Sequence, residues 1–129
     1  MGLDVFGRIK DIVSANIDEL LSKAEDPEKM ADQMVRKYED AIKDLLGSTA
    51  SVMASAREAK AKVDACDAEI KKYGTYAERA LRDGNEEKAR QAITLKQEQE
   101  DLRPTLMQSY VTVKVQADKA EEDYRKLTA

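Results

Sequence analysis

Apolar residues recur along the chain with the spacing of helices, and two short polar segments interrupt the pattern. These interruptions are residues 24–27 and residues 83–85. At the first, Asp26 is a favourable N-cap, and Pro27 then stands at the first helical position, where its missing N–H costs nothing. At the second, Gly84 tolerates a positive φ, which a helix end often requires. The pattern therefore predicts three helices, over residues 3–23, 27–82 and 86–129.

The two longer segments carry apolar and small residues at alternating spacings of four and three. In residues 27–82 the positions are Leu45, Thr49, Val52, Ala56, Ala59, Val63, Cys66, Ile70, Tyr73, Ala77 and Ala80. In residues 86–129 they are Ala92, Leu95, Gln99, Leu102, Leu106, Tyr110, Val113, Ala117, Ala120, Tyr124 and Leu127. A sustained period of about 3.5 residues is typical of a left-handed coiled coil.

A short turn made of Asp83, Gly84 and Asn85 joins the two long segments, so they must fold back antiparallel. The predicted fold class is all-α, an N-terminal amphipathic helix followed by a long antiparallel coiled-coil helical hairpin. Residues 1–23 form the first part, and residues 24–129 form the hairpin, with arms at 27–82 and 86–129.

The two predicted arms differ in length. At about 1.5 Å per residue, residues 27–82 make about 84 Å of helix and residues 86–129 make about 66 Å. The shorter arm therefore ends level with about residue 39, and the apolar residues before that point have no partner in the hairpin. These residues are Met30, Met34, Val35 and Tyr38. An unpartnered apolar stripe predicts a contact surface, here for self-association. The alternative is that the first segment folds back and covers it.

Residues 3–23 carry a wide apolar face. At about 100° per residue, the apolar side chains gather on one half of the helix. They are Leu3, Val5, Phe6, Ile9, Ile12, Val13, Ile17 and Leu20. A helix of this form lies in a membrane interface, and here binding rests on apolar insertion because acidic residues slightly outnumber basic ones. The alternative is that this face packs on the hairpin or on a neighbouring protein.

Composition excludes most catalytic classes. The chain has no His and one Cys, so it lacks the side chains for a zinc site, a Ser-His-Asp triad or a Cys-His pair. No glycine-rich phosphate loop is present, and we expect no enzyme activity, cofactor or metal. The net charge of −4 argues against a nucleic-acid partner. No apolar run is long enough to span a membrane, and no signal peptide is recognisable, so we expect a cytoplasmic location.

Arginines flank the predicted hairpin tip. Arg79 and Arg90 stand on either side of the turn, among acidic residues. One interpretation is that they dock on a neighbouring subunit during assembly. The alternative is an ordinary solvated face with charge pairs one helical turn apart.

Two stretches resemble the phage-shock protein A family, which includes the vesicle-inducing protein in plastids. The first is VSANIDELLSKAEDPEK at residues 13–29. The second, at residues 77–92, contains AERAL, then Gly84 and Glu86, then ARQA. The two stretches stand at the spacing found in that family.

The resemblance implies a bacterial relative of the ESCRT-III membrane-remodelling proteins. By position, residues 2–22 correspond to the membrane-binding helix, Pro27 begins the hairpin and Gly84 marks its tip. Members form homo-oligomers or polymers and protect the inner face of the cytoplasmic membrane under envelope stress. They usually carry further helices after the hairpin that are not in this sequence, so a short member and a shortened chain both stay open.

The predicted function is therefore membrane association, self-assembly and remodelling or protection of the cytoplasmic membrane, with lipid and further copies of the chain as partners. Some members of the family also hold an AAA+ transcription activator inactive through the hairpin. The alternative function is a soluble coiled-coil adaptor that binds and inhibits such an activator.

Overall fold

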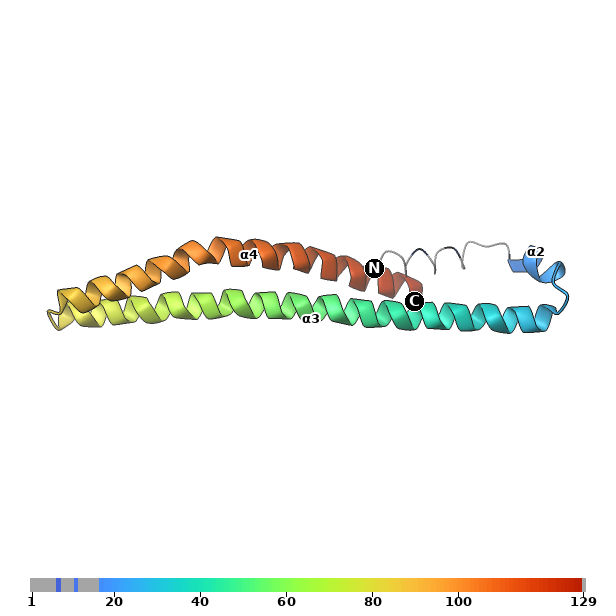
Figure 1. Ribbon diagram of the computed structural model, residues 1–129, viewed down its shortest axis with the longest axis horizontal. Coiled ribbons are helices and arrows are strands. Elements are labelled where there is room, and N and C mark those ends of the chain that lie inside the picture. Colours follow the sequence, from blue (N-terminus) through green and yellow to red (C-terminus); the bar gives the residue numbers. More distant parts are fainter. Residues whose placement is uncertain (1–6, 8–10, 12–16, 129) are drawn as a thin grey trace. The chain divides into compact units, whose positions relative to one another are not determined.

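The computed structural model describes Gly7, Asp11 and residues 17–128. This part of the chain contains α2 (Ile17–Ser22), α3 (Pro27–Arg82) and α4 (Glu86–Thr128), which Figure 1 shows in chain order. Every other described residue is helical or belongs to a short connection, and no strand occurs among them. The all-α fold class predicted from the sequence is confirmed.

The start of α3 is capped by its own preceding residue. The Asp26 side-chain oxygen Oδ1 accepts a hydrogen bond of 3.1 Å from the Lys29 N–H. The Asp26 carbonyl oxygen accepts one of 3.0 Å from the Met30 N–H. Pro27 is the first helical residue, so the missing proline donor leaves no gap in the helix. The predicted N-cap is confirmed.

The turn between α3 and α4 closes one helix and opens the next. Gly84 has φ 72°, a left-handed conformation that favours glycine. The Asn85 N–H donates to the Ala80 carbonyl at 2.8 Å and the Gly84 N–H donates to the Leu81 carbonyl at 3.1 Å. These two bonds make a Schellman motif, which satisfies carbonyls at the end of α3. Asn85 Oδ1 then accepts from the Lys88 N–H at 3.1 Å and caps α4.

The helices pack in two compact units. One, here called the base unit, comprises Met1–Met53 and Gln116–Ala129, and the other, the tip unit, comprises Ala54–Val115. In the base unit, α3 and α4 pack around buried Ala41 and Leu45, against which further apolar side chains lie. These are Tyr38, Ile42, Tyr124 and Leu127.

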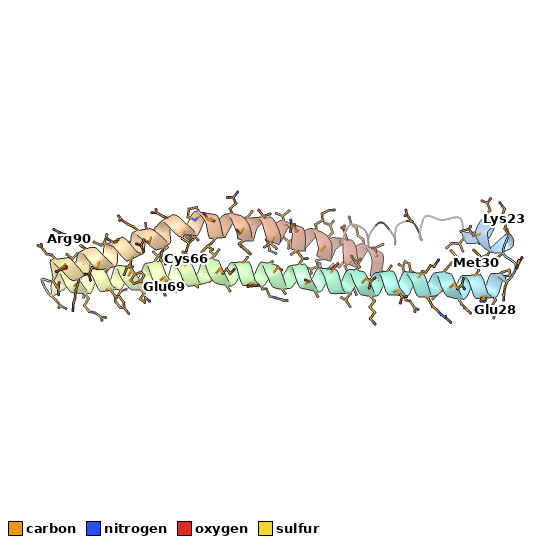
Figure 2. The ribbon with its side chains drawn as sticks, in the orientation of Figure 1. Lys23, Glu28, Met30, Cys66, Glu69 and Arg90 are labelled. Carbon is orange, nitrogen blue, oxygen red and sulfur yellow. The ribbon has the colours of Figure 1, made fainter. Side chains whose placement is uncertain are left out.

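In the tip unit, small residues bring α3 and α4 close together. The buried apolar side chains are Ala56, Val63, Cys66, Ala77, Ala80, Ala89 and Ala92. The Cys66 S–H donates to the Gln99 carbonyl oxygen at 3.2 Å, and Figure 2 labels this cysteine on α3. The Arg103 guanidinium also reaches across to the Asp67 carboxylate, with N···O distances of 2.5 Å and 3.3 Å. The pairing is antiparallel.

The predicted seam of α3 is confirmed, because every expected position from Leu45 to Ala80 is buried or half-buried. The prediction for Leu95 and Leu102 of α4 is wrong, since they are 40% and 45% exposed. The half-buried positions are instead Lys96 and Arg103. Their long stems cover the seam of small residues while the charged ends stay in water.

Candidate functional site

Of the residues predicted to bind a membrane, the structure describes Ile17 and Leu20. Both lie in α2 and are 42% and 41% exposed. The others lie outside the described residues; they are Leu3, Val5, Phe6, Ile9, Ile12 and Val13. Two large aliphatic side chains on one short helix thus face solvent and are available for contact with lipid or protein.

The end of α2 is fixed by local hydrogen bonds. The Ala24 N–H donates to the Leu21 carbonyl at 3.3 Å, and Ser22 Oγ donates to the Glu19 carbonyl at 2.9 Å. Lys23 Nζ pairs with the Glu19 carboxylate at 2.9 Å. Leu21 and Ala24 are half-buried. The connection from α2 to α3 is therefore only four residues long, residues 23–26.

The stripe predicted to mediate assembly does not behave as one surface. Met30 and Met34 are half-buried, whereas Val35 is 55% exposed. The expectation that Tyr38 has no partner in the hairpin is wrong, because its hydroxyl donates to the Leu127 carbonyl oxygen at 3.0 Å. Carbonyl oxygens in the last turn of a helix receive no hydrogen bond from an N–H of that helix, and the Tyr38 hydroxyl supplies a donor to this one. A role for these residues in assembly stays a prediction.

A second apolar stripe runs along one side of α3 in the base unit. Val35, Ile42, Leu46 and Met53 are spaced by seven, four and seven residues, which places them on one helical face. Val35 and Leu46 are 55% and 48% exposed, and the other two are half-buried. We call these four residues the α3 flank. Sequence reasoning singled out only Val35, although this spacing could have identified the other three.

The outer side of α4 carries a third apolar stripe, which sequence reasoning missed. Met107, Val111 and Val115 follow one another at intervals of four residues and are 36%, 49% and 63% exposed. Between Arg103 and Asp118 the only charged residue is Lys114. A charge-poor window in a chain that is 37% charged is the signal that could have found this stripe.

The tip of the hairpin combines aromatic and charged side chains. The Tyr73 and Tyr76 rings meet edge to face, with centroids 6.3 Å apart, and Lys72 Nζ lies 4.9 Å from the centre of the Tyr73 ring. Such contacts add to the attraction from area burial alone. Hydrogen bonding to Lys72 also lowers the pKa of the Glu69 carboxyl group.

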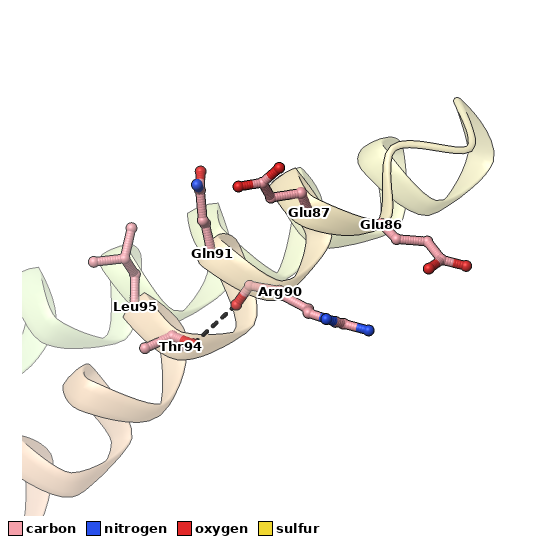
Figure 3. A pocket seen from close by; sticks show the side chains of 6 residues that line it. All are labelled: Glu86, Glu87, Arg90, Gln91, Thr94 and Leu95. Carbon is pink, nitrogen blue, oxygen red and sulfur yellow. Dashed lines mark hydrogen bonds between the residues drawn. The ribbon is translucent and has the colours of Figure 1, made fainter.

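The two arginines singled out by the sequence lie on either side of this tip. Arg90 lines a shallow depression on α4 with Glu86, Glu87, Gln91, Thr94 and Leu95, and its guanidinium points away from the helix (Figure 3). Its carbonyl accepts a 2.9 Å hydrogen bond from Thr94 Oγ1. Arg79 lines a separate depression with both tyrosines. In the described part of the chain neither arginine forms an ion pair, so both guanidinium groups are available for an outside partner.

One ion pair crosses between the helices of the tip unit. Two hydrogen bonds from Arg103 hold the pKa of the Asp67 carboxyl below its ordinary value of 3.8. The side chains of Arg103 and Asp67 are 41% and 47% exposed, so solvent screens much of their attraction. This pair fixes register more than it adds stability.

Among the described residues, no group of acidic or cysteine side chains is arranged to hold a metal ion. Within the same residues, no helix combines the length and apolar character needed to cross a membrane.

The comparison with known proteins decides the family. The model of the PspA/IM30 family matches residues 4–129, which is nearly the whole chain. The chain belongs to the PspA/IM30 family. Its relatives include a phage shock protein A homolog of Bacillus subtilis, which is 44% identical over 94 residues, covering 73% of this chain and 41% of the relative.

Other members of the family are similar over a longer stretch. The membrane-associated protein Vipp1 of Nostoc punctiforme is 35% identical over 118 residues, covering 92% of this chain and 45% of that protein. A phage shock protein A homolog of Deinococcus radiodurans is 34% identical over 100 residues, which cover 78% of this chain and 45% of the relative. The chain thus spans less than half the length of these relatives.

Proposed function

We propose that this PspA/IM30 family member is a non-enzymatic, peripheral membrane protein that self-assembles on the inner face of the cytoplasmic membrane and remodels or protects it. The observation that carries the proposal is the apolar face of residues 3–23, together with membership of a family that includes proteins named membrane-associated. Ile17 and Leu20, the described part of that face, are 42% and 41% exposed.

Lipid contact through this face rests on the hydrophobic effect. Burying one large aliphatic or aromatic side chain contributes about 1.5–3 kcal/mol. The apolar face contains several, among them Phe6, Ile9 and Ile17, so insertion outweighs the cost of ordering one short helix. Because the segment carries more acidic than basic residues, we expect packing defects and curvature, rather than anionic headgroups alone, to favour binding.

Self-assembly multiplies this contact. Several copies joined through their hairpins bind one membrane with many weak contacts, so the array holds far more tightly than one copy does. The features that support assembly are the exposed stripe of Met107, Val111 and Val115 and the guanidinium groups of Arg79 and Arg90, which form no ion pair with another described residue. An array of this kind stiffens or curves the bilayer it covers.

Co-sedimentation with small anionic vesicles tests the proposal. We expect the chain to pellet with vesicles, and the double variant Phe6→Asp/Ile9→Asp to bind at least about tenfold more weakly, because two buried apolar side chains are lost. Leu81→Asp is the matched control, since Leu81 is 59% exposed at the tip and far along the sequence from the apolar face. Equal binding by the chain and the double variant contradicts the proposal and favours the adaptor function instead.

A further inference from the structure

The α3 flank borders the packed seam of the base unit without being part of it. Ile42 lies against the Ala41–Leu45 core, while Val35 and Leu46 remain about half exposed. The opposite side of α3 is polar in this unit, with Lys37 and Ser51 both exposed. A helix that packs beside the α3–α4 pair in this unit therefore has one apolar side of α3 available to it.

The length of the N-terminal segment matches this stripe. The helix predicted from the sequence would be about 30 Å long over residues 3–22, and residues 27–46 of α3 have the same length. Only residues 23–26 separate α2 from α3, which is the length of an ordinary connection between antiparallel helices. A segment that folds back over this connection therefore reaches from the start of α3 to Leu46, the last strongly exposed residue of the stripe.

Charged residues at the edge of the α3 flank fit the same alignment of the N-terminal segment with residues 27–46. Asp32 and Glu39 stand beside the α3 flank on its outer edge, and Lys10 stands at the edge of the apolar face of the N-terminal segment. Counted from the connection at residues 23–26, Lys10 and Glu39 lie equally far along their segments. Folding back therefore brings Lys10 level with Glu39. The apolar stripe and the charge at its edge thus select one occupant, the chain's own N-terminal segment.

We propose that residues 3–16, when the chain is away from lipid, dock their apolar face on Val35, Ile42 and Leu46 of the α3 flank, with Lys10 beside Glu39. This inference rests on the proposed function, because the same apolar face cannot contact lipid and α3 at once. Docking therefore competes with membrane insertion and weakens apparent lipid affinity in proportion to the docked fraction. The flank acts as an autoinhibitory surface that lipid displaces.

In the first test, polar substitutions on the α3 flank are expected to increase vesicle affinity. In Val35→Glu and Leu46→Glu the flank becomes polar, so the segment is released and vesicle binding tightens, by about threefold if two thirds of the molecules are docked. Small phosphatidylcholine vesicles avoid repulsion between the added carboxylate and anionic lipid. Ser51→Glu, on the polar side of the same helix, is the control and leaves binding unchanged. Binding that is unchanged or weaker in both flank variants overturns the proposal.

The second test does not depend on lipid. A carbodiimide activates the Glu39 carboxylate, and the Lys10 amine attacks it to form an amide with release of the urea by-product. Peptide mass spectrometry of the lipid-free chain is expected to find the Lys10–Glu39 amide, which is lost in Leu46→Glu. Mixing isotope-labelled and unlabelled copies separates links within one chain from links between chains. Links between chains alone, or no such link, overturn the proposal.

The two tests also separate this inference from the proposed function. If Phe6→Asp/Ile9→Asp binds vesicles as well as the parent chain but the intrachain amide forms, the membrane function fails and the docking stands. If vesicle binding depends on Phe6 and Ile9 but neither flank variant tightens it and no amide forms, the docking fails and the membrane function stands.

Discussion

The base unit and the tip unit join the same two helices by different means. The base unit packs large side chains, with Leu45 at 3% exposure and Tyr38, Tyr124 and Leu127 beside it. The buried positions of the tip unit are mostly alanines, and directional contacts such as the Cys66–Gln99 hydrogen bond cross its seam. The base unit is therefore held together mainly by large buried side chains. The tip unit is held together by closely spaced backbones and by polar contacts between the helices.

This difference indicates which substitutions each unit tolerates without loss of stability. A large side chain in the base unit leaves a cavity when it is shortened, whereas an alanine in the tip unit has no methylene groups to lose. The base unit also holds two buried hydroxyl oxygens, Ser48 Oγ and Thr49 Oγ1, that have no hydrogen-bond partner among the described residues. The tip unit instead depends on geometry at its turn, where Gly84 adopts φ 72°.

The largest effect is expected from Leu45→Ala. Removing this buried side chain leaves a cavity in the base unit, so the free energy of unfolding falls by about 2–5 kcal/mol. Urea unfolding followed by circular dichroism at fixed protein concentration measures the change. Leu81→Ala is the matched control, because Leu81 lies in the same helix at 59% exposure and its loss costs about 0.5 kcal/mol or less. Equal effects of the two variants contradict volume packing in the base unit.

A smaller effect of opposite sign is expected from Thr49→Val. Thr49 is 4% exposed and its hydroxyl has no partner, so an isosteric methyl group removes a desolvation cost and stabilises the chain by about 1 kcal/mol. Thermal unfolding of the two chains measures the gain. The control is Thr94→Val, which changes an exposed threonine whose hydroxyl bonds the Arg90 carbonyl and brings no gain. A destabilised Thr49→Val variant shows that the hydroxyl does find a partner.

The sequence predicts where the helices begin and end better than it predicts which side of each helix is buried. Helix ends follow from local chemistry, and Asp26, Pro27 and Gly84 each act within a few residues, so their roles can be read without tertiary information. The seam on α4 cannot be read this way. The series through Leu95 and Leu102 and the one through Lys96 and Arg103 both have the heptad period, and only the partner helix selects between them.

The candidate site shows the same limit. The apolar face of residues 3–23 is visible as a local period, but whether Tyr38 has a partner depends on the register of two helices far apart in sequence. One hydrogen bond from the tyrosine hydroxyl to the Leu127 carbonyl is enough to reverse that expectation. The exposed stripes on α3 and α4 follow regular spacings, but spacing alone does not tell an exposed apolar face from a buried one.

The smallest effect is expected in the tip unit, from the Asp67–Arg103 pair. Because the folded state lowers the pKa of Asp67 below 3.8, the pair stabilises the chain above that pH and its contribution disappears as the pH falls through the lowered value. We expect Asp67→Asn to lower the melting temperature slightly at neutral pH, and the difference from the parent chain to vanish in strong acid. Both side chains are substantially exposed, so added salt reduces the difference at neutral pH as well. Glu122→Gln, which removes an exposed pair with Lys126 within one helix, is the control for general charge effects. A difference that persists unchanged in acid means that Asp67 acts through packing, and the tip unit then resembles the base unit more closely than its contacts indicate.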